Sequence, residues 1–136
     1  MSLTGKCLCG AVTFTADEVD SHVHGCHCSM CRNWSGSPML AASVGSVSFT
    51  GEESISRYLS SEWAERGFCS KCGSNLFYRL KEADQYIMCT GAFDDQSGFE
   101  LVGEIYIDEK PPGYGFAGDH PRQTGAEFMA SLQGDD

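Results

Sequence analysis

The alternation of apolar and polar residues along the chain predicts a protein built mostly of short β-strands. Residues 11–16 place Val12 and Phe14 on one side and threonines on the other, the period of two expected of a half-buried strand. Glycine and serine residues separate such segments, and the sequence contains no internal repeat, low-complexity tract or linker. The remaining predicted strands are residues 39–44, 46–50, 54–59, 75–80, 86–92 and 104–107.

Two pairings are expected among these strands. Residues 39–44 and 46–50 should pair around Gly45, and residues 75–80 and 86–92 should pair across the polar connection 81–85. We therefore expect short antiparallel sheets.

Helix is scarce in this pattern. Residues 29–34 predict a single helical turn. Near the C-terminus, Thr124 and Glu127 form a capping-box sequence that precedes the apolar stripe Phe128, Met129 and Leu132. The fold class predicted is mostly β, a zinc-containing β fold of short antiparallel sheets with a short C-terminal helix. At 136 residues, the chain is expected to form a single domain over residues 1–136.

The net charge of the chain argues against some classes of binding partner. The formal net charge is −10, which argues against binding to a nucleic-acid backbone. No apolar run approaches the roughly 20 residues of a membrane-spanning helix, so no membrane association is expected. The first residues lack the apolar stretch of a signal peptide. We therefore expect a cytoplasmic protein with reduced thiols.

Cysteine spacing carries the strongest chemical signal. Seven of the eight cysteines fall in three clusters, which are Cys7-Leu8-Cys9, Cys26-His27-Cys28-Ser29-Met30-Cys31 and Cys69-Ser70-Lys71-Cys72. A disulfide framework is the first alternative, because the number of cysteines is even. It conflicts with the expected compartment and with the C-x-C spacing, which would close a strained ring. A redox pair at Cys69 and Cys72 is a second alternative, although no βαβ pattern surrounds it.

Two of the clusters are suited to a closed metal site. Cys7-x-Cys9 and Cys69-x-x-Cys72 lie far apart in the sequence, and each precedes a predicted strand. Gly10 and Gly73 follow the pairs and permit the tight turns that a chain needs to curl around a metal ion. Four thiolates complete a tetrahedral zinc site. We therefore predict that Cys7, Cys9, Cys69 and Cys72 hold a structural zinc ion.

The remaining cluster is local and has three thiols. Cys26, Cys28 and Cys31 would leave the fourth zinc position open to water or a substrate thiol. A thiol bound to zinc is held as thiolate, the nucleophilic form. Three thiolates around Zn²⁺ keep a net negative charge, so a neighbouring cation is expected, and Arg32 is the candidate. The alternative for Arg32 is a solvated surface side chain.

Three histidines and the eighth cysteine lie outside these two ligand sets. His27 lies between two candidate ligands and is expected to form a hydrogen bond to a neighbouring group rather than to bind the metal. His22 and His24 are expected in an exposed loop. Cys89 lies in the apolar run 86–89, where a lone cysteine behaves as a small hydrophobe, with a fourth-ligand role as the alternative.

With these residues in place, the chain resembles the glutathione-dependent formaldehyde-activating enzyme family, which shares its domain with centromere protein V. The resemblance runs over nearly the whole length. The segments that carry it are GKCLCGAV at 5–12, CHCSMCR at 26–32, SGS at 35–37, RGFCSKCGS at 66–74, GAFDD at 91–95 and IYIDEKP at 105–111.

The resemblance implies a β fold with two zinc ions per chain, one bound by four cysteines and one by three. By motif position, the structural ligands fall on Cys7, Cys9, Cys69 and Cys72, and the catalytic ligands on Cys26, Cys28 and Cys31. The activity implied is that of a carbon–sulfur lyase that joins glutathione, or a similar small thiol, with formaldehyde, or a similar small aldehyde. Family members often carry His where Glu104 stands and Trp near residues 113–114, and this chain has neither. A non-catalytic zinc module that binds a protein partner or senses thiols is the alternative function.

Overall fold

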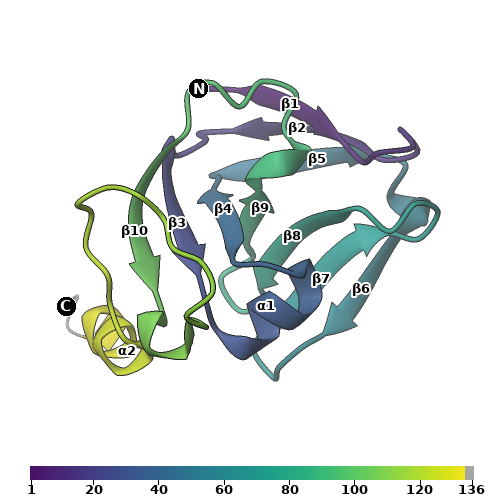
Figure 1. Cartoon of the computed structure of the whole chain (residues 1–136). Coiled ribbons are helices and arrows are strands. Elements are labelled where there is room, and N and C mark those ends of the chain that lie inside the picture. The colour runs from purple at the N-terminus through teal and green to yellow at the C-terminus, as the bar shows by residue number, and fades with distance from the viewer. Residues whose placement is uncertain (134–136) are drawn as a thin grey trace. The chain divides into compact units, whose positions relative to one another are not determined.

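The computed structural model describes residues 1–133 and traces the strands and helices shown in Figure 1. The chain forms two compact units. Unit 1 comprises Met1–Ser21 and Ala41–Phe99, and unit 2 comprises His22–Leu40 and the described residues from Glu100 onward. The strands are β1 Leu3–Lys6, β2 Thr13–Asp17, β3 His22–Cys26, β4 Met39–Ser43, β5 Ser46–Thr50, β6 Ile55–Leu59, β7 Ala64–Cys69, β8 Asn75–Leu80, β9 Gln85–Cys89 and β10 Glu100–Ile105. The helices are α1 Ser29–Ser35 and α2 Gly125–Gln133, with short 3₁₀ turns η1 Glu52–Ser54, η2 Thr90–Ala92 and η3 Ile107–Glu109.

Unit 1 consists of antiparallel strands around an aromatic core. Strands β1, β2 and β5 form a three-stranded sheet in that order, and β9, β8, β7 and β6 pair successively, with β4 residues 41–43 on β9. The alternation in β2 buries Phe14 and exposes the threonines, as predicted. Phe49 of β5 contacts Phe77 of β8 and Tyr86 of β9, with ring centroids 5.5 and 5.8 Å apart. Such aromatic contacts bury large apolar area and join the two sets of strands.

Gly67 of β7 packs so closely against the Phe77 ring that no larger side chain fits there without a shift. A methyl group added there would lie 2.1 Å from Cζ of Phe77. We expect Gly67→Ala to lower the free energy of unfolding by about 1–3 kcal/mol, because the Phe77 ring would have to move within a packed core. Denaturant unfolding measures this change. Gly91→Ala is the control, because a methyl group there meets nothing within 4 Å; equal losses in the two variants would contradict the prediction.

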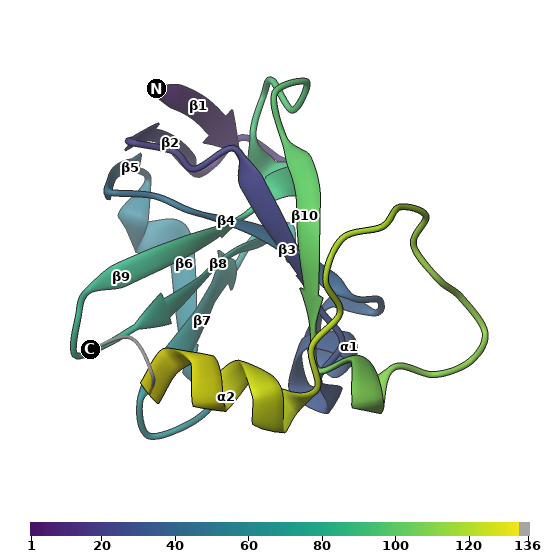
Figure 2. The same cartoon turned by 90° about the vertical axis from the view of Figure 1, so that its left-hand side faces the viewer.

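Unit 2 is organised around one parallel strand pair and two helices. Strands β3 and β10 run side by side in the same direction, as Figure 2 shows, with Gly25 opposite Glu104 and Cys26 opposite Ile105. Helix α1 begins directly after Cys28, whose Sγ accepts a hydrogen bond from the Cys31 amide at 3.4 Å. At the start of α2, the predicted capping box is confirmed. The Thr124 amide donates to Glu127 Oε1 at 2.8 Å, and the Glu127 amide donates to Thr124 Oγ1 at 3.1 Å.

The predicted fold class is confirmed, but several details differ from the prediction. Strands β4 and β5 do not pair around Gly45; β4 pairs with β9, and β5 pairs with β2. A two-residue hairpin turn requires positive φ in its centre, and Gly45 is not among the residues with positive φ. Its amide instead hydrogen bonds to the Asp17 carbonyl at 2.9 Å, which joins it to the end of β2.

Three strands were missed, because their sequences lack a clean apolar alternation. Strands β1 and β3 are short and rich in polar residues, and β7 carries a glutamate and an arginine, Glu65 and Arg66, which the structure buries. His22 and His24 therefore lie in a strand rather than in a loop, although both are exposed as expected. The parallel pairing of β3 with β10 also departs from a wholly antiparallel arrangement.

Candidate metal centres

Unit 1 brings four thiols from two distant turns into one cluster. Cys7 and Cys9 lie in the turn between β1 and β2, whereas Cys69 ends β7 and Cys72 lies in the turn between β7 and β8. Their four sulfur atoms all lie within 4.8 Å of one another. The Sγ–Sγ distance is 3.7 Å between Cys7 and Cys9 and 3.8 Å between Cys9 and Cys69. A tetrahedron of sulfurs about 2.3 Å from a central zinc has edges of about 3.8 Å, so this donor set fits zinc.

The two turns have matching backbone geometry. Gly10 and Gly73 have φ values of 81° and 80°, in the left-handed region that glycine adopts without strain. Their amides donate to the Cys7 and Cys69 carbonyls at 3.1 and 2.8 Å. Each turn thus curls back around the first cysteine of its pair, which is the role predicted for these glycines.

Amide and hydroxyl groups of the same turns point at the sulfur atoms. The Val12 amide donates to Cys7 Sγ at 3.3 Å, and the Lys71 amide donates to Cys69 Sγ at 3.4 Å. Ser74 places its hydroxyl 3.2 Å from Cys72 Sγ, and this hydrogen bond, together with others from the Ser74 and Cys9 backbones, lowers the pKa of Cys72 to about 5. Groups that hydrogen bond to thiolates favour the charged form that binds metal.

Unit 2 holds the second cluster, which is formed by one short stretch of chain. Cys26 ends β3, Cys28 caps α1 and Cys31 lies in its first turn, and the three sulfur atoms lie within 4.8 Å of one another. The hydrogen bond with Cys26 lowers the pKa of Cys28, and the same contact raises the pKa of Cys26. Three thiols at this separation thus favour one shared negative charge, which a cation would relieve. We name these three residues the tripod.

Neither cluster is a set of disulfides. All eight cysteines of the chain are free thiols, and in the four-cysteine cluster the Sγ–Sγ distances of 3.7 and 3.8 Å far exceed the roughly 2.05 Å of a disulfide bond. Sulfur ligands of this kind select soft or borderline metals such as zinc. The structure therefore provides two groups of cysteines that could hold metal, with the division into four and three that the spacing predicts.

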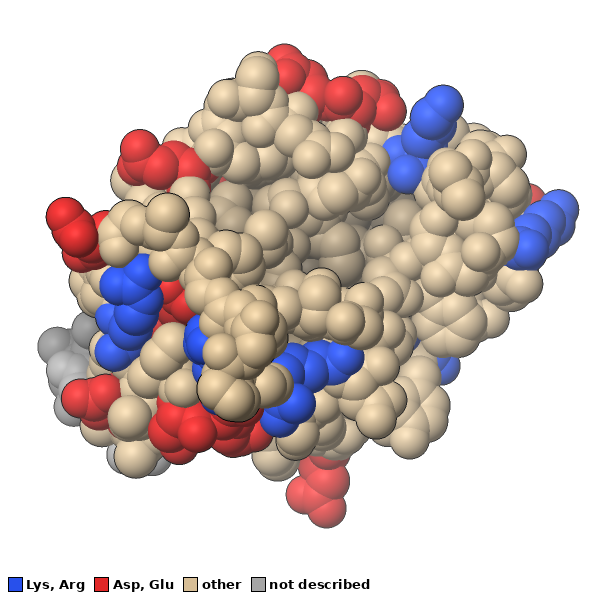
Figure 3. Space-filling model, viewed as in Figure 1, with Lys and Arg blue, Asp and Glu red and all other residues tan. Residues whose placement is uncertain are grey.

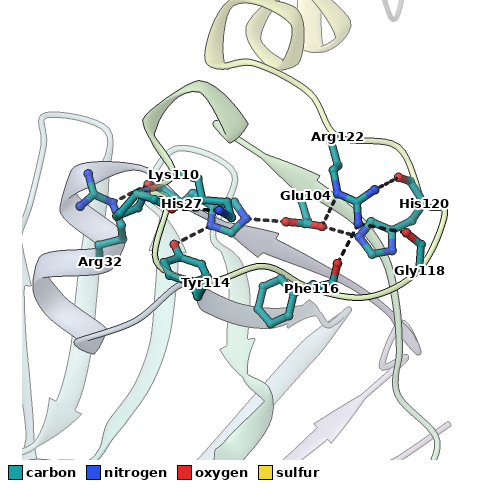
Figure 4. Close-up of polar contacts among 10 residues, drawn as sticks. His27, Arg32, Glu104, Lys110, Tyr114, Phe116, Gly118, His120 and Arg122 are labelled. Atoms are coloured by element: carbon teal, nitrogen blue, oxygen red, sulfur yellow. Dashed lines mark hydrogen bonds and ion pairs between the residues drawn. The ribbon is translucent and has the colours of Figure 1, made fainter.

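His27 lies outside both clusters and is fully buried, with 0% of its surface exposed. Its Nε2 lies 2.6 Å from Glu104 Oε1, and its Nδ1 lies 2.8 Å from the Tyr114 hydroxyl, as Figure 4 shows. The prediction that His27 forms a hydrogen bond rather than binding metal agrees with this geometry. Sequence reasoning missed Glu104 and Tyr114 as its partners, although both lie where this chain departs from the family pattern.

Arg32 and Cys89 also have defined places. Arg32 is half-buried, and its Nε donates to the His27 carbonyl at 2.8 Å, so it is not merely a solvated side chain. Cys89 ends β9 outside both clusters. Together with Lys6 and Asp94, it lines an open cavity of about 640 Å³ in unit 1.

On the face seen in Figure 3, lysine and arginine side chains are interspersed with acidic ones rather than forming one continuous basic surface. No helix within residues 1–133 is long and apolar enough to span a membrane.

The fold and the two cysteine clusters define a mostly β protein with two candidate zinc sites. The sequence profile of the glutathione-dependent formaldehyde-activating enzyme family matches residues 2–109, and the chain belongs to this family. The chain is 32% identical over 130 residues to an uncharacterized lyase of Schizosaccharomyces pombe, with 94% of this chain and 95% of that protein covered. A crystal structure of a Rhodobacter sphaeroides protein has a similar fold, with a TM-score of 0.59 and 19% identity over 88% of this chain and 99% of the other.

Proposed function

We propose that this protein is a zinc-dependent enzyme of the carbon–sulfur lyase type that acts on the adduct of a small thiol and a small aldehyde. The reaction would follow the pattern of glutathione-dependent formaldehyde activation, in which glutathione and formaldehyde give S-hydroxymethylglutathione. The observation that carries the proposal is the tripod, which offers three sulfur ligands and no fourth among the described residues. Family membership and the lyase of Schizosaccharomyces pombe support the reaction class.

In this proposal, Cys7, Cys9, Cys69 and Cys72 hold a structural zinc ion, and the tripod holds a second. A zinc ion bound at the tripod would supply an open position that keeps a thiol in its nucleophilic thiolate form. The residues of the chain position this site. Cys28 caps α1, and Arg32 donates from Nε to the carbonyl of His27, the residue between Cys26 and Cys28, at 2.8 Å. We assign Arg32 the role of balancing the single net negative charge that three thiolates and Zn²⁺ would carry.

The proposed activity predicts acceleration of a reaction that also proceeds spontaneously. Glutathione and formaldehyde should exchange with their adduct faster in the presence of zinc-loaded protein than in buffer, as measured by NMR exchange spectroscopy. Cys28→Ser should abolish the acceleration, because it removes a tripod thiol. Cys89→Ser is the matched control and should retain it, since Cys89 lies outside both clusters. A wild-type protein with both sites loaded that gives no acceleration with any small thiol and aldehyde would refute the enzymatic function.

A non-catalytic zinc module that docks onto a protein partner is the second candidate. Three large apolar side chains are exposed on the β6–β7 hairpin of unit 1, namely Tyr58, Leu59 and Trp63. Exposed apolar groups that lie together are typical of interaction sites. The exchange measurement separates the two functions, because a docking module would carry both metals and give no turnover. For either function, we propose a reducing cytoplasmic setting, because the thiols must stay unoxidised to bind metal.

A further inference from the structure

Glu104 is a buried carboxylate that collects three donors within unit 2. Only 2% of its surface is exposed. Oε1 lies 2.6 Å from His27 Nε2, and Oε2 lies 2.5 Å from His120 Nε2 and 2.9 Å from Arg122 Nε. Burial alone would raise the pKa of Glu104, but the hydrogen bonds from His120 and His27 and the charge of Arg122 hold it below its ordinary value. The side chain is therefore an ionised acceptor with both oxygens used.

Glu104 contacts His27, the residue that lies between the tripod ligands Cys26 and Cys28. An ionised carboxylate can only accept hydrogen bonds, so the proton of His27 lies on Nε2. In this tautomer the Nδ1 atom accepts from the Tyr114 hydroxyl at 2.8 Å. The His27 backbone is fixed as well, since its amide donates to the Ile105 carbonyl at 3.1 Å and its carbonyl accepts from Arg32. Hydrogen bonds thus engage both ring nitrogens, the amide and the carbonyl of His27, the residue between Cys26 and Cys28.

Glu104 also fastens residues 111–123, which we name the strap. The Arg122 guanidinium donates to the Phe116 and Gly118 carbonyls at 2.9 and 3.0 Å, in addition to its ion pair with Glu104. The Glu104 amide donates to the Pro121 carbonyl at 3.0 Å. Figure 4 shows the strap passing from Tyr114, beside His27, to Arg122, beside Glu104. The strap lies beyond residue 109, where the match to the family profile ends.

We propose that Glu104 is a positioning residue for the tripod metal centre, which acts by orienting His27 between Cys26 and Cys28 and by fastening the strap that brings Tyr114 onto His27. This inference rests on the proposed function in one respect, namely that the tripod holds a metal ion. Groups that hydrogen bond directly to metal ligands commonly change metal affinity by about 10–100-fold when mutated, and Glu104 acts one residue further from the metal. The role of Glu104 is therefore measurable on the metal itself, without turnover.

The test compares Glu104→Gln with wild type, each loaded with two metal ions per chain. Zinc release to a chromogenic chelator should give two phases, and Cys28→Ser identifies the phase of the four-cysteine site. In Glu104→Gln we expect tripod release to accelerate by about 10-fold, the lower end of that range, with the other phase unchanged. We also expect the cobalt-loaded tripod to shift its visible absorption, because the ligand geometry relaxes.

Glu65→Gln is the matched control for loss of a buried carboxylate. Glu65 is 8% exposed and pairs with Arg57 and Arg79 at 3.3 and 2.9 Å. It should leave the cobalt spectrum and both release phases unchanged, even if it lowers the melting temperature. A Glu104→Gln protein that releases tripod metal at the wild-type rate would overturn the proposal, as would one that loosens both sites equally.

Arg122→Gln keeps the test decisive if Glu104→Gln does not fold. Arg122 is partly exposed, and its replacement removes one hydrogen-bond donor to Glu104 while leaving the carboxylate in place. Tripod release should accelerate several-fold, and a wild-type rate would contradict the role of Glu104. A wild-type protein that takes up only one cobalt would overturn both the proposed function and this inference. Two bound cobalt ions without acceleration of the exchange reaction would overturn the enzymatic function alone.

Discussion

Cys69→Ser should leave the protein largely unfolded at ambient temperature. Cys69 is 0% exposed at the end of β7, and its cluster ties the β7–β8 turn to the β1–β2 turn across 60 residues of sequence. Structural zinc sites contribute roughly 10–16 kcal/mol of binding free energy, whereas small proteins are stable by only about 5–15 kcal/mol. Loss of this metal would therefore remove stabilising free energy comparable to the whole free energy of unfolding.

Circular dichroism and denaturant unfolding of the metal-loaded proteins measure the effect. Cys89→Ser is the control, because it changes the same atom in β9 outside both clusters. It should cost about 1 kcal/mol or less. Addition of a strong chelator to wild type should reproduce the effect of Cys69→Ser. A Cys69→Ser protein as stable as Cys89→Ser would show that the four-cysteine cluster does not hold the fold together.

Cys28→Ser should have the opposite profile, with metal and activity lost and the fold retained. Zinc content is expected to fall from about two ions per chain to about one, because two thiols alone make a weak site. The fold survives because Cys28 also caps α1, with its Sγ accepting the Cys31 amide. Serine is among the best residues for that capping position, so the helix keeps its N-terminal hydrogen bond.

Metal analysis together with thermal unfolding distinguishes this outcome from a structural role. The melting temperature of Cys28→Ser should stay close to that of wild type when the four-cysteine site is loaded, while acceleration of thiol–aldehyde exchange disappears. Retention of two tightly bound zinc ions would contradict the assignment of Cys28 as a ligand. Unfolding comparable to that of Cys69→Ser would contradict the division into one structural and one open site.

Much of the candidate chemistry could be predicted from local spacing. The C-x-C and C-x-x-C patterns fix which thiols are neighbours, and Gly10 and Gly73 provide the left-handed turns that the structure shows with φ near 80°. The capping box at Thr124 and Glu127 is equally local, and its two hydrogen bonds form as predicted. Such features depend on a few adjacent residues, so sequence reasoning reaches them reliably.

Strand pairing was harder to predict, because it depends on partners far away in the sequence. In the polar strand β7, the buried Glu65 forms ion pairs with Arg57 and Arg79. The sequence around Glu65 does not predict these partners. The same holds for β3, which pairs with β10 more than 70 positions later in the chain. The incorrect β4–β5 pairing arose because proximity in sequence suggested a hairpin at Gly45, whose backbone lacks the positive φ of such a turn.

The sequence by itself determined the ligand inventory, namely seven clustered thiols divided into two pairs and a triplet, because metal-binding spacing is a property of short segments. The sequence also predicted that the two pairs meet, but only the tertiary structure gave their sulfur–sulfur distance of 3.8 Å and showed that His27 joins Glu104 and Tyr114. These contacts link residues separated by 60 to 87 positions. Their geometry follows from how strands and turns pack, because burial of Glu104 and His27 requires that each find its hydrogen-bonding partner.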